Sequence, residues 1–235
     1  MARASRTASQ SGGARRDGKN EGKRDLKRGA DKPNRAAQTR DKIIQAAIAE
    51  FASKGLDGAR VDEVARRSGV NKTLLYQYVG NKDDLFTAAL EAAYLSIRAR
   101  QKEFLAERME PEAGVRKLVH LLLSIWVEHQ EYGKLLASEN FHGGKHVRRS
   151  KLIGEMYGQI VETLTDLLQR GAAQGVFRKG IDPVDLYISI SSLSAYYVAH
   201  QHTLNAIFHI DVLKPKRLKQ REEHIVEMVL RFVKQ

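Results

Sequence analysis

Apolar residues recur at three- and four-residue intervals along most of the chain after Thr39, which is the pattern of amphipathic helices. No stretch of alternating apolar and polar residues is long enough to indicate a strand. Only 4 prolines and 18 glycines interrupt the 235 residues, and such residues are frequent in turn-rich β proteins. The sequence therefore predicts an all-α fold.

Capping residues predict where several helices begin and end. Thr39 is a candidate N-cap for the first helix, which we expect to end at Gly55. Asn71 is a candidate N-cap for a short helix, and Asn81 with Asp84 resembles a capping box at the start of a long one. The remaining expected helices cover residues 61–67, 72–79, 82–108, 112–126, 132–138, 153–171, 183–207 and 215–233, with a loop at 140–145.

The composition excludes several classes of site. The chain has no cysteine, so disulfides, thiolate zinc sites and iron–sulfur clusters are excluded. His142 and His146 are four residues apart, but Gly143 and Gly144 between them disfavour the helix that would bring both onto one face, so we expect no metal. Phosphate-binding loops, hydrolase motifs and dinucleotide fingerprints are missing from the sequence, so we expect neither a cofactor nor enzymatic activity.

Two further features concern the compartment and the partners. No apolar run reaches the roughly 18 residues of a membrane-spanning helix, and the N-terminus is polar and basic, so we expect a cytoplasmic protein without a membrane partner. Residues 1–38 contain 11 basic and 4 acidic residues, a net charge of +7, and almost no large apolar residue. We expect this tail to be disordered. It is either an arm that lies along DNA phosphates or a solvated leader.

Residues 61–79 have the spacing of two short helices that pack across a tight turn. Ala65 is small where the helices approach most closely, and Gly69 tolerates a positive φ at the turn. The outward positions near the start of the second helix carry hydrogen-bonding side chains that can enter a DNA major groove. The alternative is a helical hairpin with a purely structural role. The outward residues are Lys72, Thr73, Leu74 and Gln77.

Residues 39–86 resemble the N-terminal DNA-binding domain of the TetR family of bacterial transcriptional regulators. The similarity lies in Phe51 and Gly55, the sequence Val-Asp-Glu-Val-Ala at 61–65, Gly-Val at 69–70, Leu-Tyr-Gln-Tyr at 75–78, and two lysines. The resemblance implies that some side chains face bases and that others hold phosphates. Those that face bases are Lys72, Thr73, Leu74 and Gln77, and those that hold phosphates are Tyr76, Tyr78 and Lys82.

The sequence departs from the family pattern in three places. Arg60 stands where the family usually has a Thr or Ser cap, Thr73 and Leu74 replace Gly-Thr, and Val79 replaces a common Phe. We expect Arg60 to reach a phosphate and Leu74 to touch a thymine methyl group.

The resemblance also implies that residues 87–235 form a helical domain for effector binding and dimerisation. Residues 171–190 are similar to the link that precedes the last helices in the family, and residues 139–150 are similar to a subgroup that includes regulators of aromatic or heterocyclic catabolism. The expected organisation is therefore a basic tail at 1–38, a DNA-binding domain at 39–86 and an effector-binding domain at 87–235, with an aromatic or heterocyclic small molecule as effector.

Two sets of residues are candidates for the surfaces of this second domain. The resemblance implies that the helices over about 149–173 and 183–207 pair two subunits. The alternative is that these faces only complete the core of one chain. The candidates for the homodimer interface are Ile153, Ile160, Leu164, Leu167, Ser191, Ser194 and Ala195. Polar aromatic residues on apolar faces are either effector contacts or packing residues. The candidates for the effector pocket are His120, Trp126, Asn140, Phe141, His142, Tyr157, Tyr196, Tyr197 and His200.

Together these features predict a dimeric transcriptional repressor that binds an inverted-repeat operator in double-stranded DNA and that a small molecule releases. The alternative is a basic architectural protein that binds DNA without sequence preference and without an effector.

Overall fold

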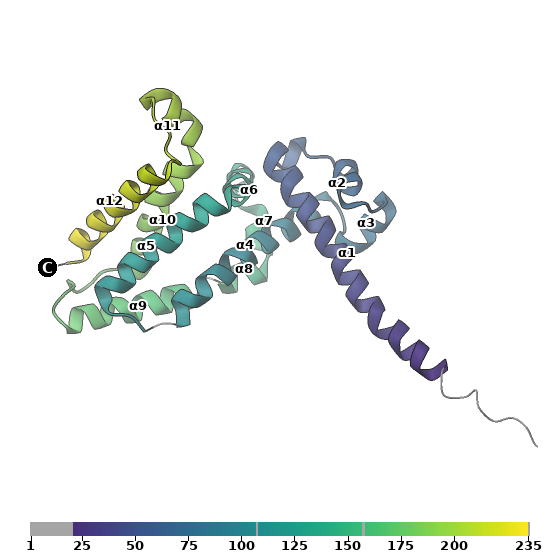
Figure 1. The fold of residues 1–235 in the computed structure, drawn as a ribbon, viewed down its shortest axis with the longest axis horizontal. Helices are drawn as coiled ribbons and strands as arrows, with labels where there is room; N and C mark the ends of the chain where they lie inside the picture. Colours follow the sequence, from purple (N-terminus) through teal and green to yellow (C-terminus); the bar gives the residue numbers. More distant parts are fainter. Residues whose placement is uncertain (1–20, 107, 157, 235) are drawn as a thin grey trace, which may run out of the picture. The chain divides into compact units, whose positions relative to one another are not determined.

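The computed structural model describes residues 21–106, 108–156 and 158–234, and its regular structure is α-helical throughout these ranges (Figure 1). The predicted all-α fold is thus confirmed. The helices are α1 (Glu21–Gly58), α2 (Val61–Ser68), α3 (Lys72–Val79), α4 (Lys82–Ala106), α5 (Pro111–Glu128), α6 (Gln130–Phe141), α7 (Lys145–Arg149), α8 (Lys151–Met156), α9 (Gly158–Ala173), α10 (Pro183–Ala199), α11 (Gln201–Phe208) and α12 (Pro215–Val233).

The chain forms two compact units, residues 1–41 and residues 42–235. The described part of the first unit is the N-terminal part of α1, which begins at Glu21 and not at the expected N-cap Thr39. Thr39 instead lies inside the helix, where its hydroxyl donates to the carbonyl oxygen of Arg35 at 2.8 Å. The Lys, Arg, Ala and Gln residues before Thr39 are good helix formers, and a helix extends at lower cost than it nucleates. For residues 1–20, which lie outside the described residues, the expected disorder stays a prediction.

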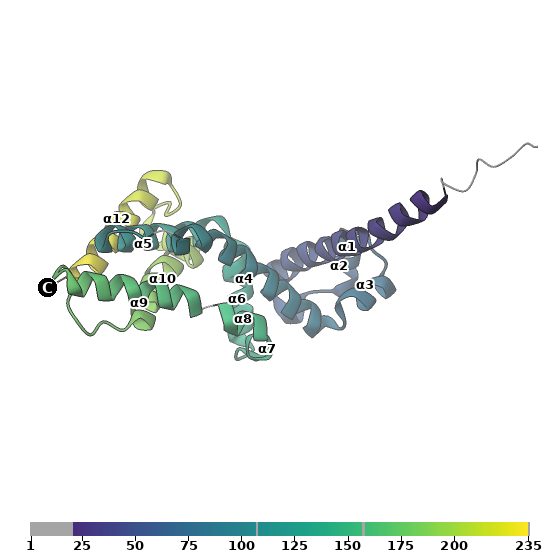
Figure 2. The ribbon, with the colours of Figure 1, turned by 90° about the horizontal axis from the view of Figure 1, so that it is seen from below.

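The second unit begins with a three-helix arrangement of the C-terminal part of α1 with α2 and α3 (Figure 2). Its core is apolar and fully enclosed: Phe51 is 1% exposed and Leu75 is 0% exposed. The ring of Phe51 meets that of Phe86 on α4 edge to face, with centroids 5.0 Å apart. This contact attaches the three helices to the first turns of α4.

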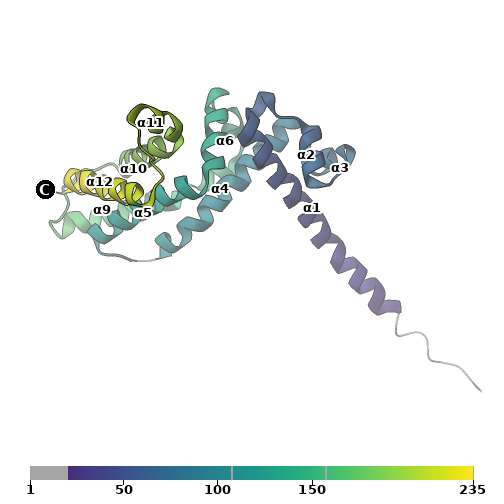
Figure 3. The same cartoon turned by 45° about the horizontal axis from the view of Figure 1, so that its top comes forward.

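Helix α4 leads from this arrangement into the helices that follow (Figure 3). It contacts α3 near its start and then α5, α6, α7, α8 and α9. One helix thus contacts both α3 and the later helices.

Helix α5 lies at the centre of the remaining helices and packs against α4, α6, α9, α10 and α12. Its apolar residues recur at helical spacing, and Val115, Leu118 and Val119 are 0% exposed. A side chain at Gly114 would lie 2.5 Å from Leu167 on α9, so glycine permits the close approach of these two helices. The core of this part of the chain therefore forms around α5.

Gly55 lies where the first helix is expected to end, and its φ of 68° and ψ of 176° are not helical. The helix therefore has a kink at Gly55, before a last turn that reaches Gly58. The helix expected over 153–171 is helical at all of its described residues, in α8 and α9, and residue 157 between them lies outside the described residues. The helix expected over 183–207 is divided at His200, whose backbone N–H and ring nitrogen both lie 3.1 Å from the carbonyl oxygen of Tyr196.

In the ranges that the structure describes, none of the helices is both long enough and apolar enough to cross a lipid bilayer.

Candidate DNA-binding site

The turn between α2 and α3 has the geometry that its sequence predicts. Gly69 adopts the left-handed conformation, with φ 69° and ψ 22°, and the backbone N–H of Val70 donates to the carbonyl of Ala65 at 3.1 Å. Ala65 is 7% exposed, which allows the close helix approach. The side chain of Asn71 accepts from the backbone N–H of Leu74 at 2.8 Å, so the predicted N-cap of α3 is confirmed.

Helix α3 turns one polar face outward. Lys72, Thr73, Tyr76 and Gln77 are exposed, whereas Leu75 and Val79 on the opposite face are buried. Positions 72, 73, 76 and 77 share one side of an α-helix because they are one turn apart. Four of the residues predicted to contact DNA are therefore presented together, at the N-terminal end of a helix where the dipole is positive.

The other predicted DNA-contact residues are less accessible. Leu74 and Tyr78 are half-buried, and Lys82, also half-buried, donates from Nζ to the carbonyl oxygen of Asp57 at 3.1 Å. Arg60 is exposed and occupies the N-cap position of α2 without a capping hydrogen bond from its side chain. The base and phosphate roles of all these side chains stay predictions.

Ion pairs occupy the surface of α2 beside this face. Lys72 pairs with Asp62 at 2.7 Å, and this carboxylate raises the pKa of Lys72. Hydrogen bonds from Arg66, which has the larger effect, and from Arg67 lower the pKa of Glu63 to about 2. Lys72 and Arg66 are exposed, so on the proposed DNA contact of this face each can exchange its carboxylate for an acceptor on DNA at small cost. Arg67 also pairs with the buried Glu50 at 3.3 Å.

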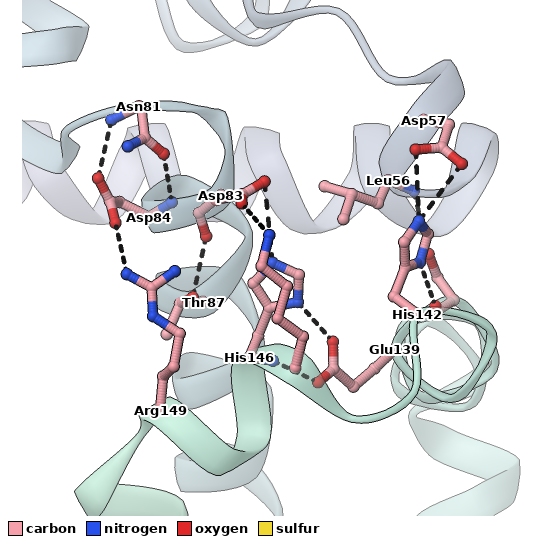
Figure 4. Close-up of polar contacts among 12 residues, drawn as sticks. Leu56, Asp57, Asn81, Asp83, Asp84, Thr87, Glu139, His142, His146 and Arg149 are labelled. Carbon is pink, nitrogen blue, oxygen red and sulfur yellow. Dashed lines mark hydrogen bonds and ion pairs between the residues drawn. The ribbon is translucent and has the colours of Figure 1, made fainter.

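A second set of contacts joins the α6–α7 region to the ends of α1 and α4 (Figure 4). The hydroxyl of Ser138 accepts from the backbone N–H of Leu56 at 3.0 Å, and the ring of His142 lies 3.3 Å from the carboxylate of Asp57. We call this set the junction cluster. It consists of Ser138, Glu139, His142, Lys145, His146 and Arg149 on one side, and of Leu56, Asp57, Asp83 and Asp84 on the other.

Glu139 and His146 form the buried centre of the junction cluster, with 2% and 0% exposure. One carboxylate oxygen of Glu139 accepts from the backbone N–H groups of His146 at 2.7 Å and Val147 at 2.9 Å, and the other lies 2.7 Å from Nδ1 of His146. The remaining ring nitrogen of His146 has no hydrogen bond and lies 3.9 Å from Asp83. The carboxylate of Glu139 thus fixes both the backbone of α7 and the imidazole that faces α4.

The electrostatics of the junction cluster favour the charged forms of its exposed members. Lys145 donates to Asp83 at 2.5 Å and lowers the pKa of this carboxyl group. The carbonyl of Ser138, which accepts from the ring, and the nearby Asp57 raise the pKa of His142. Asn81 and Asp84 also exchange hydrogen bonds at 3.0 and 3.1 Å, so the predicted capping box at the start of α4 is confirmed.

The cavities that we describe, which are lined by described residues, include Trp126 and none of the other predicted effector residues. Trp126 lines a cavity between α5, α6, α10 and α11, and it does so without the other candidates. Tyr157 lies outside the described residues. On the surface, His120 lies within hydrogen-bond distance of Glu222, Asn140 donates to the carbonyl of Leu136, and Phe141 is 85% exposed. His142 belongs to the junction cluster. Tyr196 stacks on the exposed His200, and the guanidinium of Arg221 lies over the ring of Tyr197.

The predicted dimer residues also lie differently from the expectation. Ile153, Ile160, Leu164, Leu167 and Ser194 are buried in the core of the chain itself, and Ser191 and Ala195 are half-buried. For the buried residues the alternative interpretation, completion of one chain's core, describes what the structure shows. The apolar side chains that α10 leaves exposed are Val184, Ile188 and Tyr196, at 45%, 53% and 57%.

The sequence offered little signal for the junction cluster. Glu139 and His146 look like ordinary surface residues of a helix end and a loop, and their burial follows from the turn at Gly143 and Gly144, both with positive φ. The seven-residue separation of an acid and a base across two glycines is the one pattern that indicates their pairing. Among the described residues, no group of three or more acidic or histidine side chains is arranged to hold a metal ion.

A tight helix turn, a capped second helix with an exposed polar face, and a helical domain reached through α4 define a helix-turn-helix DNA-binding protein. The models of two families match the chain. Residues 43–89 match bacterial regulatory proteins of the tetR family, and residues 111–229 match the tetracyclin repressor-like C-terminal domain. The chain belongs to the TetR family of transcriptional regulators.

Individual relatives agree with this assignment. The transcriptional repressor NicS of Pseudomonas putida is 32% identical over 177 residues, which cover 75% of this chain and 84% of that protein. The transcriptional repressor SCO4008 of Streptomyces coelicolor is 29% identical over 161 residues, which cover 68% and 78%. The crystal structure of the regulator FadR from Bacillus subtilis in complex with stearoyl-CoA superposes with a TM-score of 0.63 at 18% identity, and covers 82% of this chain and 98% of that one.

Proposed function

We propose that the protein is a homodimeric repressor that binds an inverted-repeat operator through α3 and leaves it when a small molecule binds the helical domain. The observation that carries the proposal is the exposed face of α3 with Lys72, Thr73 and Gln77 at a capped helix N-terminus. Relatives that are named repressors support the sign of regulation. In this proposal residues 39–86 bind DNA and residues 87–235 provide the effector and dimer surfaces. The protein acts on DNA in the cytoplasm as a regulator and not as an enzyme.

Coupling between the two activities follows from the contacts of α4 and of the junction cluster. An effector that prefers a conformer with displaced α6 or α4 lowers DNA affinity by its differential binding energy. Because Asp83 and Asp84 lie in the first turn of α4, next to α3, the junction cluster ties the effector-binding helices to the position of α3. The FadR structure is a complex with stearoyl-CoA, which supports a small-molecule ligand for a regulator of this fold.

The proposal is tested by a footprint on the intergenic DNA beside the gene, at about 0.15 M salt with excess random competitor. A protected inverted repeat, with half-sites about 34–36 Å apart, is the expected result. Diffuse protection that competitor removes would favour the architectural alternative. Deletion of residues 1–38 also distinguishes the repressor from the architectural protein. If the architectural alternative holds, the tail, with its net charge of +7, determines most of the affinity for DNA, and its deletion removes that affinity.

Asp62→Asn is expected to strengthen DNA binding about two- to fivefold, because it frees Lys72 from its 2.7 Å ion pair. Fluorescence anisotropy with labelled duplex measures the change for operator and random DNA. Glu227→Gln on α12 removes a similar exposed ion pair, with Arg231, and serves as the control. Equal affinities of Asp62→Asn and the unsubstituted protein would show that Lys72 does not approach DNA.

Ile188→Asp is expected to raise the dimer dissociation constant about 100-fold, because each subunit would bring a carboxylate into an apolar contact across the two-fold axis. Sedimentation over a concentration series measures it. The control is Leu95→Asp on α4, since Leu95 is 49% exposed and Ile188 is 53% exposed. If only the control dissociated, the dimer surface would have to lie away from α10.

A further inference from the structure

A cavity of about 130 Å³ lies between α6 on one side and α10 and α11 on the other, with the end of α5 at its base. Its apolar wall consists of Trp126, Ala137 and Val198. A benzene molecule fills an engineered apolar cavity of about 150 Å³ in a well-studied case. The space therefore suits a single six-membered ring.

The position of the indole of Trp126 depends on a glycine. A side chain added at Gly133 would lie 2.9 Å from Cζ3 of Trp126, closer than side-chain atoms come in practice. Glycine at this position therefore lets the indole approach α6 closely. The ring is also held by Tyr132, whose centroid is 5.6 Å away. The aromatic wall of the cavity is thus fixed in place before a ligand arrives.

The polar groups of the cavity favour an anion. Lys134 and His202 line it, and none of the lining residues, all of which belong to the described part of the chain, is acidic. No acidic side chain among the described residues pairs with Lys134, in contrast to the paired Lys72 and Lys145. Gln130 and Gln201 bond each other at 3.1 Å and close one side with an amide pair. A ring that carries one carboxylate satisfies the apolar wall and the free ammonium group at the same time.

We propose that this cavity binds a small monocyclic aromatic carboxylate. This inference rests on the proposed function, because it gives the effector of the repressor a place and a chemical class. Helix α6 supplies one wall of the cavity through Gly133, Lys134 and Ala137, and the following residues Ser138 and Glu139 belong to the junction cluster. A ligand that shifts α6 therefore acts directly on the contacts that hold α4 and the end of α1.

The sole tryptophan of the chain makes the test direct, because its fluorescence reports on the wall of the cavity without any DNA. Benzoate is the probe, with benzamide as its uncharged analogue. We expect a saturable change in Trp126 fluorescence with benzoate, and a weaker affinity for benzamide. Lys134→Met should raise the dissociation constant for benzoate about fivefold and leave that for benzamide unchanged. The control is Lys151→Met on α8, which removes an exposed lysine away from the cavity.

Ala137→Phe provides a second variant, since Ala137 is exposed and a larger side chain there fills the cavity without disturbing the core. It should abolish the response to benzoate while the far-ultraviolet circular dichroism stays unchanged. A missing response of the unsubstituted protein at about 10 mM benzoate, where even a millimolar ligand is bound, would overturn the inference. An undiminished response of Ala137→Phe would do the same.

Operator binding in the presence of benzoate separates the two proposals. A saturable change in Trp126 fluorescence together with a loss of operator affinity supports both the ligand site and the repressor function. Saturable fluorescence with unchanged operator affinity supports the site and contradicts release by an effector bound there. Specific operator binding without any fluorescence response sustains the repressor and removes this ligand site.

Discussion

Glu139→Ala is expected to lower the free energy of unfolding by about 3 kcal/mol, because it removes one partner of a buried, hydrogen-bonded pair. The carboxylate accepts from two backbone N–H groups, those of His146 and Val147, and also contacts the imidazole of His146. Alanine leaves all three without a partner at a site that is 2% exposed. For a chain of this size the loss corresponds to a decrease in Tm of about 6–12 °C.

Thermal and urea unfolding measure this loss, and two variants serve as comparison. Glu155→Ala replaces an exposed glutamate on α8 and should change the free energy by less than about 0.5 kcal/mol. Glu139→Gln keeps an oxygen that can accept from the two backbone groups, so it should lose less than alanine does. If Glu139→Ala and Glu155→Ala unfolded at the same temperature, the junction cluster would contribute nothing to stability.

Gln77→Ala is expected to reduce affinity for the operator by about 30-fold or more and to leave affinity for random duplex almost unchanged. A bidentate contact from Gln to adenine contributes roughly 1–3 kcal/mol of discrimination, and a dimer makes the contact twice. Gln77 is exposed on the same face of α3 as Thr73, so it is placed to reach a base edge. Competition titrations with operator variants at each half-site position measure the change.

Lys82→Ala is the matched contrast within the same interface. It should weaken operator and random DNA equally and lower the slope of log K against log salt by about 0.9 for each phosphate that the protein no longer neutralises. Its present bond to the carbonyl of Asp57 holds the ammonium group at the start of α4, beside α3. Identical effects of Gln77→Ala and Lys82→Ala on specific and nonspecific DNA would show that the two roles are assigned wrongly.

Helix positions follow closely from local signals in this chain. The 72–79 helix agrees to the residue because Asn71 caps it and Gly80 ends it, and α12 agrees because Pro215 starts it. Where local signals compete, the expectation is wrong. Thr39 is a good cap in isolation, but helix formers precede it and α1 continues through it. Periodicity alone joins residues 183–207 into one helix, whereas the structure divides this segment at His200.

The face of α3 could be predicted from sequence, because a short helix with two buried positions has its outward side fixed by geometry. The effector and dimer residues could not. Periodicity shows that Ile160 and Leu164 are apolar and inward, but it does not show whether the neighbour is the same chain or another one. His142 likewise has the character of a pocket residue, and its ring is used instead to reach Asp57 across 85 residues of sequence.

The ion pair between Lys72 and Asp62 has a consequence for the timing of gene control. On the proposed contact of Lys72 with DNA, the carboxylate of Asp62 competes for the same ammonium group and is expected to raise the rate of dissociation from any duplex. Shorter residence on random sequence lets each dimer sample more of the chromosome per unit time. The same carboxylate shortens the delay between arrival of the effector and departure from the operator.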